Sequence, residues 1–409
     1  MKRLLFVVIC VSLFLPLQAQ EEFPQKKPFS FARQHFEFGI DAGVGIGNDL
    51  VGINDIFRDE VILDLNNLGI GEDGFNLYFN VGPFVGAFFN LKNLRIAGGR
   101  WDIGFFAGGD GSIRANIPES IFKLISEGNR NNQYVTGMIG ASGAIHAQAG
   151  MKMSARYNRL RLGFTPSLFA PLIYIPSSGF NYVFDTTDGI RLGADGEISV
   201  YCPFIGDDDY TFSSDKLKYG FDISMFAEFS LFSFLELGGS VTNLPISPAI
   251  LDHRMKLTVS LSDDFKVTGQ DLMDGKGMDF PDVDFDYVYD DPVEKKVYRP
   301  LRFDVYARFK PFGGSELLVL RPNLGFTVDV SEKEGYYNMG LEARLNLGNV
   351  LIPYVSVNRE EGLYKNRFGL IFNLRIFELG VEAAMQSQEL AGSFKAKGLD
   401  LNAGIRFGF

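Results

Sequence analysis

The chain has 409 residues and carries 39 basic and 50 acidic side chains, giving a formal net charge of −11 at pH 7. An acidic chain has no general attraction for phosphate backbones, so nucleic acid is excluded as an expected partner. The two cysteines exclude a disulfide framework, and 40 Phe with 46 Gly are unusual for a soluble globular domain.

The N-terminus has the pattern of an export signal. Lys2 and Arg3 form a basic start, Leu4 to Leu15 form an apolar core, and Ala19 supplies the small residue expected near a signal-peptidase site. The apolar run is shorter than the roughly 20 residues of a membrane-spanning helix. We therefore predict that residues 1–20 are a signal peptide, which is removed on export.

After the signal, apolar and polar residues alternate in segments of about ten residues. Such a segment is long enough to cross the hydrocarbon as a tilted strand that has one apolar face. Phe and Gly abundance with few helical patterns is typical of an envelope barrel. The expected strands are residues 36–46, 75–88, 94–107, 141–157, 160–168, 190–200, 219–229, 235–241, 255–261, 301–309, 324–330, 339–347, 368–376, 377–385 and 398–409. Residues 180–187 and 281–290 are two further candidate strands, which the alternation of short and long connections calls for.

These segments predict an all-β fold, a transmembrane antiparallel β-barrel of about 14–16 strands, with an even count as the default because closure leaves no edge. Residues 75–409 are expected to form this barrel. Residues 21–74 form an N-terminal segment that either fills the lumen as a hatch or contributes the first strand. Residues 47–74, 108–140, 202–218, 262–300 and 386–397 are expected to be loops.

One predicted loop contains a short amphipathic helix. Asn116 can cap it, Pro118 lies in its first turn and Gly128 ends it. Its apolar residues are either a substrate-binding surface or the face that packs the helix onto the barrel rim or into the lumen. The candidate substrate-binding residues are Ile117, Ile121, Phe122, Leu124 and Ile125.

Charged residues within the predicted strands occupy the positions opposite the apolar face. A charge turned toward lipid would cost about 2–4 kcal/mol at the centre of the bilayer, so these side chains are expected to face the lumen. Both signs occur together, which predicts a partly ion-paired interior and no ion-selective ring. The set is Lys152, Arg156, Arg302, Asp304, Arg308, Glu342, Arg344, Glu378 and Glu382.

The sequence shows no catalytic or metal-binding pattern. His35, His146 and His253 are far apart, and none has the spacing of a zinc site or accompanies a nucleophile motif. Residues 270–291 are rich in aspartate but lack the glycine and the distal glutamate of a calcium loop. We therefore expect no enzyme activity, no cofactor and no metal site.

The export signal, the barrel size, the Phe-rich strands, the N-terminal segment and the apolar loop helix together resemble the FadL-like long-chain fatty-acid transporters of outer membranes. The resemblance implies an outer-membrane location and passive uptake of hydrophobic small molecules past a hatch and through a gap in the wall. The sequence has no Asn-Pro-Ala motif near its mature N-terminus, so no functional residue is transferred from that family.

Two features extend this interpretation. Prolines at positions 83, 166, 171 and 176 each remove a ladder hydrogen bond, so they either build a gap in the wall or end strands at the rim. The terminal strand ending in Phe409 is the expected contact with the barrel-assembly machinery, and outer-membrane lipid is the expected surrounding. The alternative functions are a porin for small polar solutes and an outer-membrane adhesin or assembly barrel.

Overall fold

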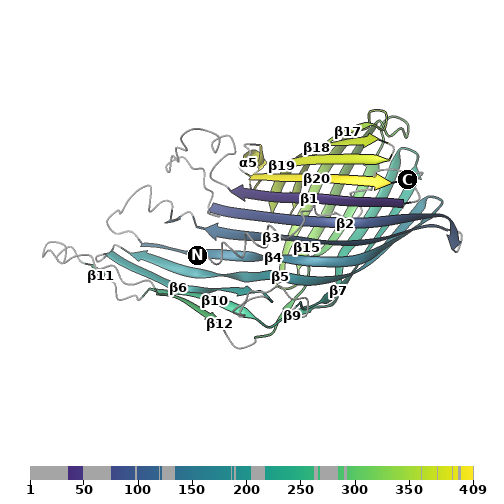
Figure 1. Cartoon of the computed structure of the whole chain (residues 1–409). Coiled ribbons are helices and arrows are strands. Elements are labelled where there is room, and N and C mark those ends of the chain that lie inside the picture. Colours follow the sequence, from purple (N-terminus) through teal and green to yellow (C-terminus); the bar gives the residue numbers. More distant parts are fainter. Residues whose placement is uncertain are drawn as a thin grey trace.

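In the computed structural model, most of the described chain forms β-strands (Figure 1). The described residues are 36–48, 75–96, 99–118, 120–121, 134–185, 187, 190–203, 217–261, 266–267, 284–289, 293–360, 362–374, 376–388, 390–394 and 398–408. Within these ranges no helix is long and apolar enough to cross a membrane. The predicted signal peptide, residues 1–20, and Phe409 lie outside them.

Fourteen antiparallel strands form a closed barrel, which confirms the predicted fold at the lower end of the expected strand number. The first strand pairs with the last along eleven residue pairs, from Glu37 opposite Gly408 to Gly47 opposite Gly398. In ring order the strands are β1 (Phe36–Asn48), β2 (Phe75–Ile96), β3 (Gly99–Ile117), β4 (Tyr134–Tyr157), β5 (Leu160–Asp185), β7 (Gly220–Phe232), β8 (Leu235–Ser247), β14 (Leu301–Phe309), β15 (Leu318–Asp329), β16 (Glu334–Leu345), β17 (Leu351–Glu360), β18 (Leu363–Leu374), β19 (Phe377–Ser387) and β20 (Gly398–Gly408).

The wall divides at β5, and we call this place the fork. Residues Leu160 to Phe169 of β5 pair with β7, whereas Gly179 to Asp185 pair with β6 (Ile190–Tyr201). Beyond β6, the sheet continues through β10 (Arg254–Leu261) to β12 (Asp284–Tyr289), and the short β11 (Lys266–Val267) also pairs with β6. These strands extend one side of the barrel away from the ring.

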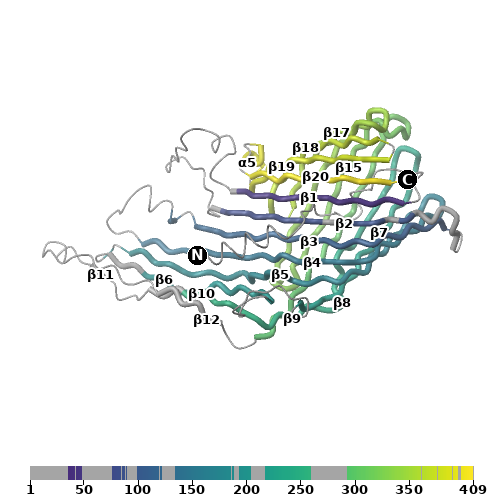
Figure 2. Tube along the Cα trace, in the orientation of Figure 1, coloured from purple at the N-terminus to yellow at the C-terminus, as the bar shows by residue number. Residues whose placement is uncertain are grey.

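The extension projects from the end of the barrel that carries the longer connections (Figures 1 and 2). Strands β4 and β5 have 24 and 26 residues, whereas β14 and β17 have 9 and 10. About ten residues suffice to cross the hydrocarbon, so roughly half of β5 stands beyond it. Since barrels of this type have short periplasmic turns and long outer loops, the extension lies on the outer side.

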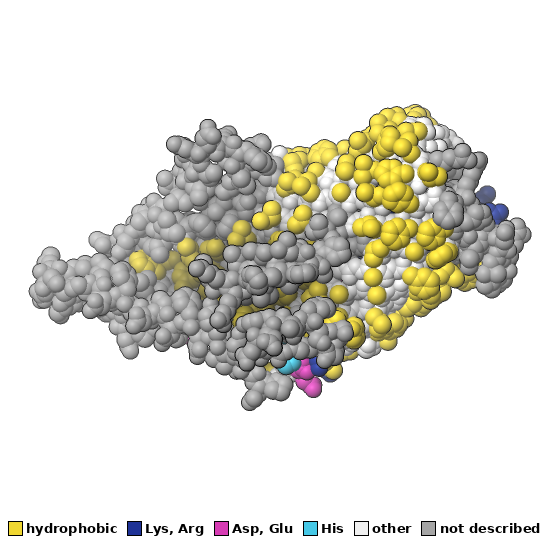
Figure 3. Space-filling model, viewed as in Figure 1, with side chains coloured by type: hydrophobic (Ala, Val, Ile, Leu, Met, Phe, Trp, Pro, Cys, Tyr) yellow, Lys and Arg dark blue, Asp and Glu magenta, His cyan; other side chains and the backbone are white. Residues whose placement is uncertain are grey.

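The barrel surface repeats the alternation that predicted it. In β14, Phe303 and Val305 are 42% and 61% exposed, while Asp304 and Tyr306 between and beyond them are buried. In β20, Leu401, Ile405 and Phe407 are exposed and Arg406 is buried. Figure 3 shows apolar side chains spread over this outer surface. A solvent-facing wall would not expose so many large apolar groups together, so the outer face is a lipid-facing belt.

Two expectations about connections are wrong. Residues 108–140 are not one loop, because β3 continues to Ile117 and β4 begins at Tyr134. The Gly- and Ser-rich composition of this stretch resembles a loop, but its residues pair across β3 and β4 in unbroken register. Gly143 has φ +142°, a conformation that favours glycine. Residues 262–300 likewise contain the short strand β11 and a further strand at Lys295–Val297, while β12 confirms the candidate strand at residues 281–290.

The N-terminal segment and the predicted loop helix are described in part. Strand β1 belongs to the wall, so the wall begins within residues 21–74; the other residues of that segment lie outside the described part. Ile117 ends β3, and Ser120 with Ile121 forms a helical turn. Phe122, Leu124 and Ile125 lie outside the described residues. A four-residue helix, α5 (Leu390–Ser393), follows β19.

Depth within the membrane should set the cost of a charge on the outer face. Val305 lies in the middle of β14 and Phe309 at its end, both facing outward. We expect Val305→Arg to lower the free energy of unfolding by about 2–4 kcal/mol. The matched control, Phe309→Arg, should lower it by about 0–1 kcal/mol on account of the charge. Urea unfolding of the protein in lipid vesicles measures both. Equal costs would contradict the assigned lipid belt.

Candidate functional site

A segment of the chain next to the fork leads into β14 and contributes Tyr298, Arg299 and Pro300 to the lining of the lumen. Residues Val293 to Pro300, which we call the lumen strap, contain β13 (Lys295–Val297), and this strand pairs with β9 (Ala249–Leu251). Val297 and Ala249 are fully buried. The pair packs against Tyr174 and Ala144, both of which line the lumen cavity. The small sheet is separate from the ring of fourteen strands and packs beside β5 and β7.

The strap ends in a buried ion pair. The guanidinium of Arg299 donates from Nε and Nη2 to the two carboxylate oxygens of Asp222, each at 2.7 Å, and from Nη2 to Ser167 Oγ at 2.7 Å. It also donates to Gln148 Oε1 and lies 5.5 Å from the centre of the Phe169 ring. The Arg299 and Asp222 side chains are only 4% and 2% exposed. Losing one partner of such a buried pair costs about 3–5 kcal/mol, because the other charge is left uncompensated.

A second set of contacts holds the outer end of the strap. Glu332, in the β15–β16 connection, accepts hydrogen bonds from Tyr174 Oη and from the Ser177 N–H at 2.9 Å, and its carboxylate lies 3.4 Å from Lys295 Nζ. Ser331 Oγ accepts a bond from the Tyr298 N–H at 2.9 Å. Burial alone would raise the pKa of Glu332, but these hydrogen bonds and Lys295 outweigh it and hold the pKa below its ordinary value of 4.5.

Asn243 fixes the C-terminal end of the strap, at Pro300, to the wall. It has φ 57°, a left-handed conformation that asparagine tolerates, and β7 and β8 lose regular register around it. Its Nδ2 donates to the Pro300 carbonyl at 3.1 Å, and its N–H donates to Ser224 Oγ at 3.0 Å. The irregularity in β8 thus directs a wall side chain to the strap.

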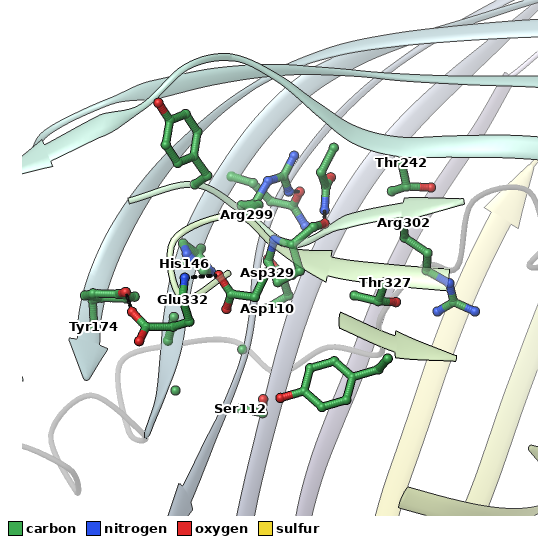
Figure 4. A pocket seen from close by; sticks show the side chains of 18 of the residues that line it. Asp110, Ser112, His146, Tyr174, Thr242, Arg299, Arg302, Thr327, Asp329 and Glu332 are labelled. Atoms are coloured by element: carbon green, nitrogen blue, oxygen red, sulfur yellow. Dashed lines mark hydrogen bonds between the residues drawn. The ribbon is translucent and has the colours of Figure 1, made fainter. Parts of the chain in front are cut away.

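A polar cavity of about 220 Å³ surrounds these contacts (Figure 4). In the figure, the side chains of Asp110, Arg299, Asp329 and Glu332 lie near one another, and Arg302 lies to one side beside Thr327. These residues come from β3, the strap, β14, β15 and the β15–β16 connection. Among the described atoms, the buried polar atoms of its lining that have no hydrogen-bond partner include His146 Nε2, Thr165 Oγ1 and Asp304 Oδ1. Such atoms favour water or a polar ligand in the cavity.

The residues proposed to face the lumen do not form one site. Lys152, Arg302 and Asp304 line the cavity, and Arg302 Nε donates to Asp304 Oδ2 at 2.7 Å. The others lie elsewhere on the wall. Arg308 pairs with Glu236 at 3.1 Å, Arg344 pairs with Glu342 at 3.1 Å, Glu382 accepts from Tyr354 and Asn402, Glu378 is 2% exposed and Arg156 is exposed near the β4–β5 turn.

Further paired charges occupy the interior on the opposite side of the barrel. Arg367 donates to both carboxylate oxygens of Glu360, at 2.8 and 2.6 Å, and Arg406 lies 3.2 Å from Asp41. All four side chains are at most 17% exposed. Charges this buried are enclosed by protein, so the described interior is filled with side chains along the β17–β20 wall and is not a wide aqueous pore.

The proposed apolar binding residues are not brought together at this cavity. Ile117 pairs with Phe75 at the outer end of β3, and neither Ile117 nor Ile121 lines the cavity. Ser120, next to Ile121, contacts the Tyr182 hydroxyl.

The sequence analysis did not identify Arg299, Asp222 or Glu332 as site residues. The available signal was Asp222, whose alternation with Phe221 and Ile223 marks it as an inward-facing acid that needs a partner.

Acidification should loosen the outer end of the strap. Because the pKa of Glu332 is lowered in the folded protein, its stabilising effect is fully present above its unfolded-state pKa and is lost as the pH falls below about 4.5 and through the folded-state value. A fluorophore attached at Lys296→Cys, in a Cys202→Ser background, should become more accessible to iodide as the pH falls through this range. In a protein that also carries Glu332→Gln, the same fluorophore should be accessible to iodide at every pH. A pH response that survives in Glu332→Gln would contradict this role.

No protein-family model and no curated protein sequence matches the chain. Solved structures do resemble it. The toluene transporter TodX of Pseudomonas putida is 9% identical, with a TM-score of 0.45 over 96% of this chain and 94% of that one. A FadL homologue of Pseudomonas aeruginosa is 9% identical, with a TM-score of 0.47 over 94% and 93%.

Barrels of another kind also resemble the chain. The translocator domain of the autotransporter NalP from Neisseria meningitidis is 8% identical, with a TM-score of 0.33 over 92% of this chain and 88% of that one. At such identities and scores, we base function on the geometry of this barrel.

Proposed function

We propose that the protein is an outer-membrane channel for passive uptake of hydrophobic molecules, which enter from the outer side and leave through the wall at the fork. The observation that carries this proposal is the contrast between two routes. The route along the lumen is lined by polar side chains and contains part of the strap, whereas the outward face of the wall at the fork is apolar.

The fork is lined on its outer side by a buried apolar cluster. Val81, Ile145, Leu172 and Ile173 are 3–8% exposed, and Leu217 from the β6–β7 connection packs against them. Ile145 immediately precedes His146 of the lumen lining on β4, and the β3–β4 ladder is regular at this place, so Ile145 faces away from the lumen. An apolar molecule that reaches this outward face would contact apolar side chains only, whereas the lumen side of the same strands carries His146 and the Arg299–Asp222 pair.

Prolines lie where the ladder is interrupted. Pro171 lies at the register shift opposite His146, and Pro176 lies in the stretch of β5 between its pairings at Tyr174 and Gly179. Pro166 lies within the regular β5–β7 ladder. A proline cannot donate to a neighbouring strand, so Pro171 and Pro176 weaken the wall at the fork. We assign these two prolines to the exit.

Long-chain fatty acids are the proposed cargo, on the resemblance seen in the sequence. Monoaromatic hydrocarbons are a second cargo class, because the solved structures that resemble this chain include channels described for them. The proposal further includes export by the signal peptide at residues 1–20, a barrel over residues 75–409 joined by β1 from the N-terminal segment, and insertion by the barrel-assembly machinery through the strand that ends at Phe409.

One observation favours a second function, a porin for small polar solutes. The lumen cavity is lined by charged and hydroxyl-bearing side chains, which suit a polar solute better than a hydrocarbon. The two functions differ in the route of the solute, along the lumen or through the wall. Changes at the fork therefore distinguish them.

Uptake by cells tests the proposal. In a Gram-negative host that lacks its own fatty-acid channel, the protein should restore uptake of a radiolabelled long-chain fatty acid. Leu172→Ser with Ile173→Ser, which makes the fork polar, should reduce that uptake several-fold. The matched control Leu324→Ser changes an outward leucine on β15, away from the fork. Sugar-driven swelling of proteoliposomes, together with fatty-acid uptake no faster than in the empty host, would instead establish the porin.

A further inference from the structure

The pocket that holds Arg299 is built by the wall and not by the strap. Asp222 comes from β7, Ser167 from β5 and Gln148 from β4, and Phe169 on β5 covers one side of the guanidinium. Gln148 and Phe169 are opposite each other in the β4–β5 ladder, and Ser167 is opposite Asp222 in the β5–β7 ladder. Strand pairing therefore keeps these four residues together whether or not the strap is present.

The chemistry of this pocket suits a planar cation. One carboxylate accepts two parallel hydrogen bonds from Nε and Nη2, a hydroxyl accepts a third and an amide oxygen a fourth. Fork-to-fork pairing of this kind is specific for guanidinium, because an ammonium ion cannot present two parallel donors. The Ser167 hydroxyl also donates to Asp222 Oδ1 at 2.6 Å, so this oxygen accepts from both Ser167 and the guanidinium. The aromatic face adds a cation–π contact.

We propose that Asp222, Ser167 and Gln148 form a guanidinium-binding site in the barrel lumen, and that Arg299 occupies this site as a tethered plug that keeps the channel closed. The ligand class that the site takes once Arg299 is removed is a small guanidinium or alkylguanidinium cation.

The other attachments of the strap are weaker than this ion pair. They include the three-residue pairing of β13 with β9, the packing of Val297 against Tyr174, the Asn243 bond to the Pro300 carbonyl, the Ser331 contact and the Lys295–Glu332 pair at 3.4 Å. The Lys295–Glu332 pair is partly exposed, with side chains 29% and 16% accessible, so solvent screens it. The Arg299 pocket is thus the firmest hold on the strap. The proposal is independent of the cargo, since it concerns how the lumen is closed.

Single-channel current in planar bilayers tests the plug. The purified wild-type barrel should pass little current, and Arg299→Ala should pass several-fold more because the strap loses its anchor. Arg299→Gln, which keeps hydrogen-bond donors without the charge, should also pass more. Heat-modifiable migration on gels checks that each variant is folded. Currents equal to wild type in the folded variants would overturn the plug.

Chemical rescue tests the site. Millimolar guanidinium chloride, far below denaturing concentrations, should reduce the current of Arg299→Ala by refilling the pocket. Urea, a neutral molecule of the same shape, should not. In the double variant Arg299→Ala with Asp222→Asn the current should no longer respond to guanidinium. A response to urea as large as that to guanidinium, or an unchanged response in the double variant, would overturn the site while leaving the proposed uptake function untouched.

Discussion

Every feature of this protein depends on one constraint, that a backbone surrounded by lipid must satisfy its hydrogen bonds within the protein. The pairing of β1 with β20 meets it by closing fourteen strands into a ring without an edge. Closure then fixes the two faces of each strand. Apolar side chains turn outward to lipid, and charges such as Asp304 and Arg406 turn inward, where they must find partners.

The fork is the place where this constraint is met in an unusual way. Strand β5 exchanges β7 for β6 partway along its length, so the ring and the outer extension share one strand. The ladder is interrupted between these pairings, and apolar packing by Leu172, Ile173 and Leu217 covers the interruption. A seam held by packing in place of hydrogen bonds is the weakest part of the wall, which is why it suits an exit for apolar molecules.

The lumen strap solves a related problem inside the ring. Asp222 lies on the inner face, 1% exposed, and a carboxylate buried to that degree is costly without a cation. Arg299 supplies the cation from a segment that does not belong to the wall. The same contact therefore neutralises the wall and holds the end of the strap at the lumen cavity. This link between charge compensation and closure is the basis of the proposed plug.

The sequence by itself determined the alternation of the strands, the lipid-facing side, the inward charges and hence the closed barrel, because a period of two is a local property of the chain. It also indicated a range of strand numbers that includes the observed fourteen. Only the tertiary structure decided which strands pair, where β5 changes partner and that the end of the strap lies at the lumen cavity. Register and partner choice arise between distant segments, and Gly-rich stretches such as 108–117 carry no hydrophobic period. The partnership of Arg299 with Asp222, 77 residues apart, could not be predicted for the same reason.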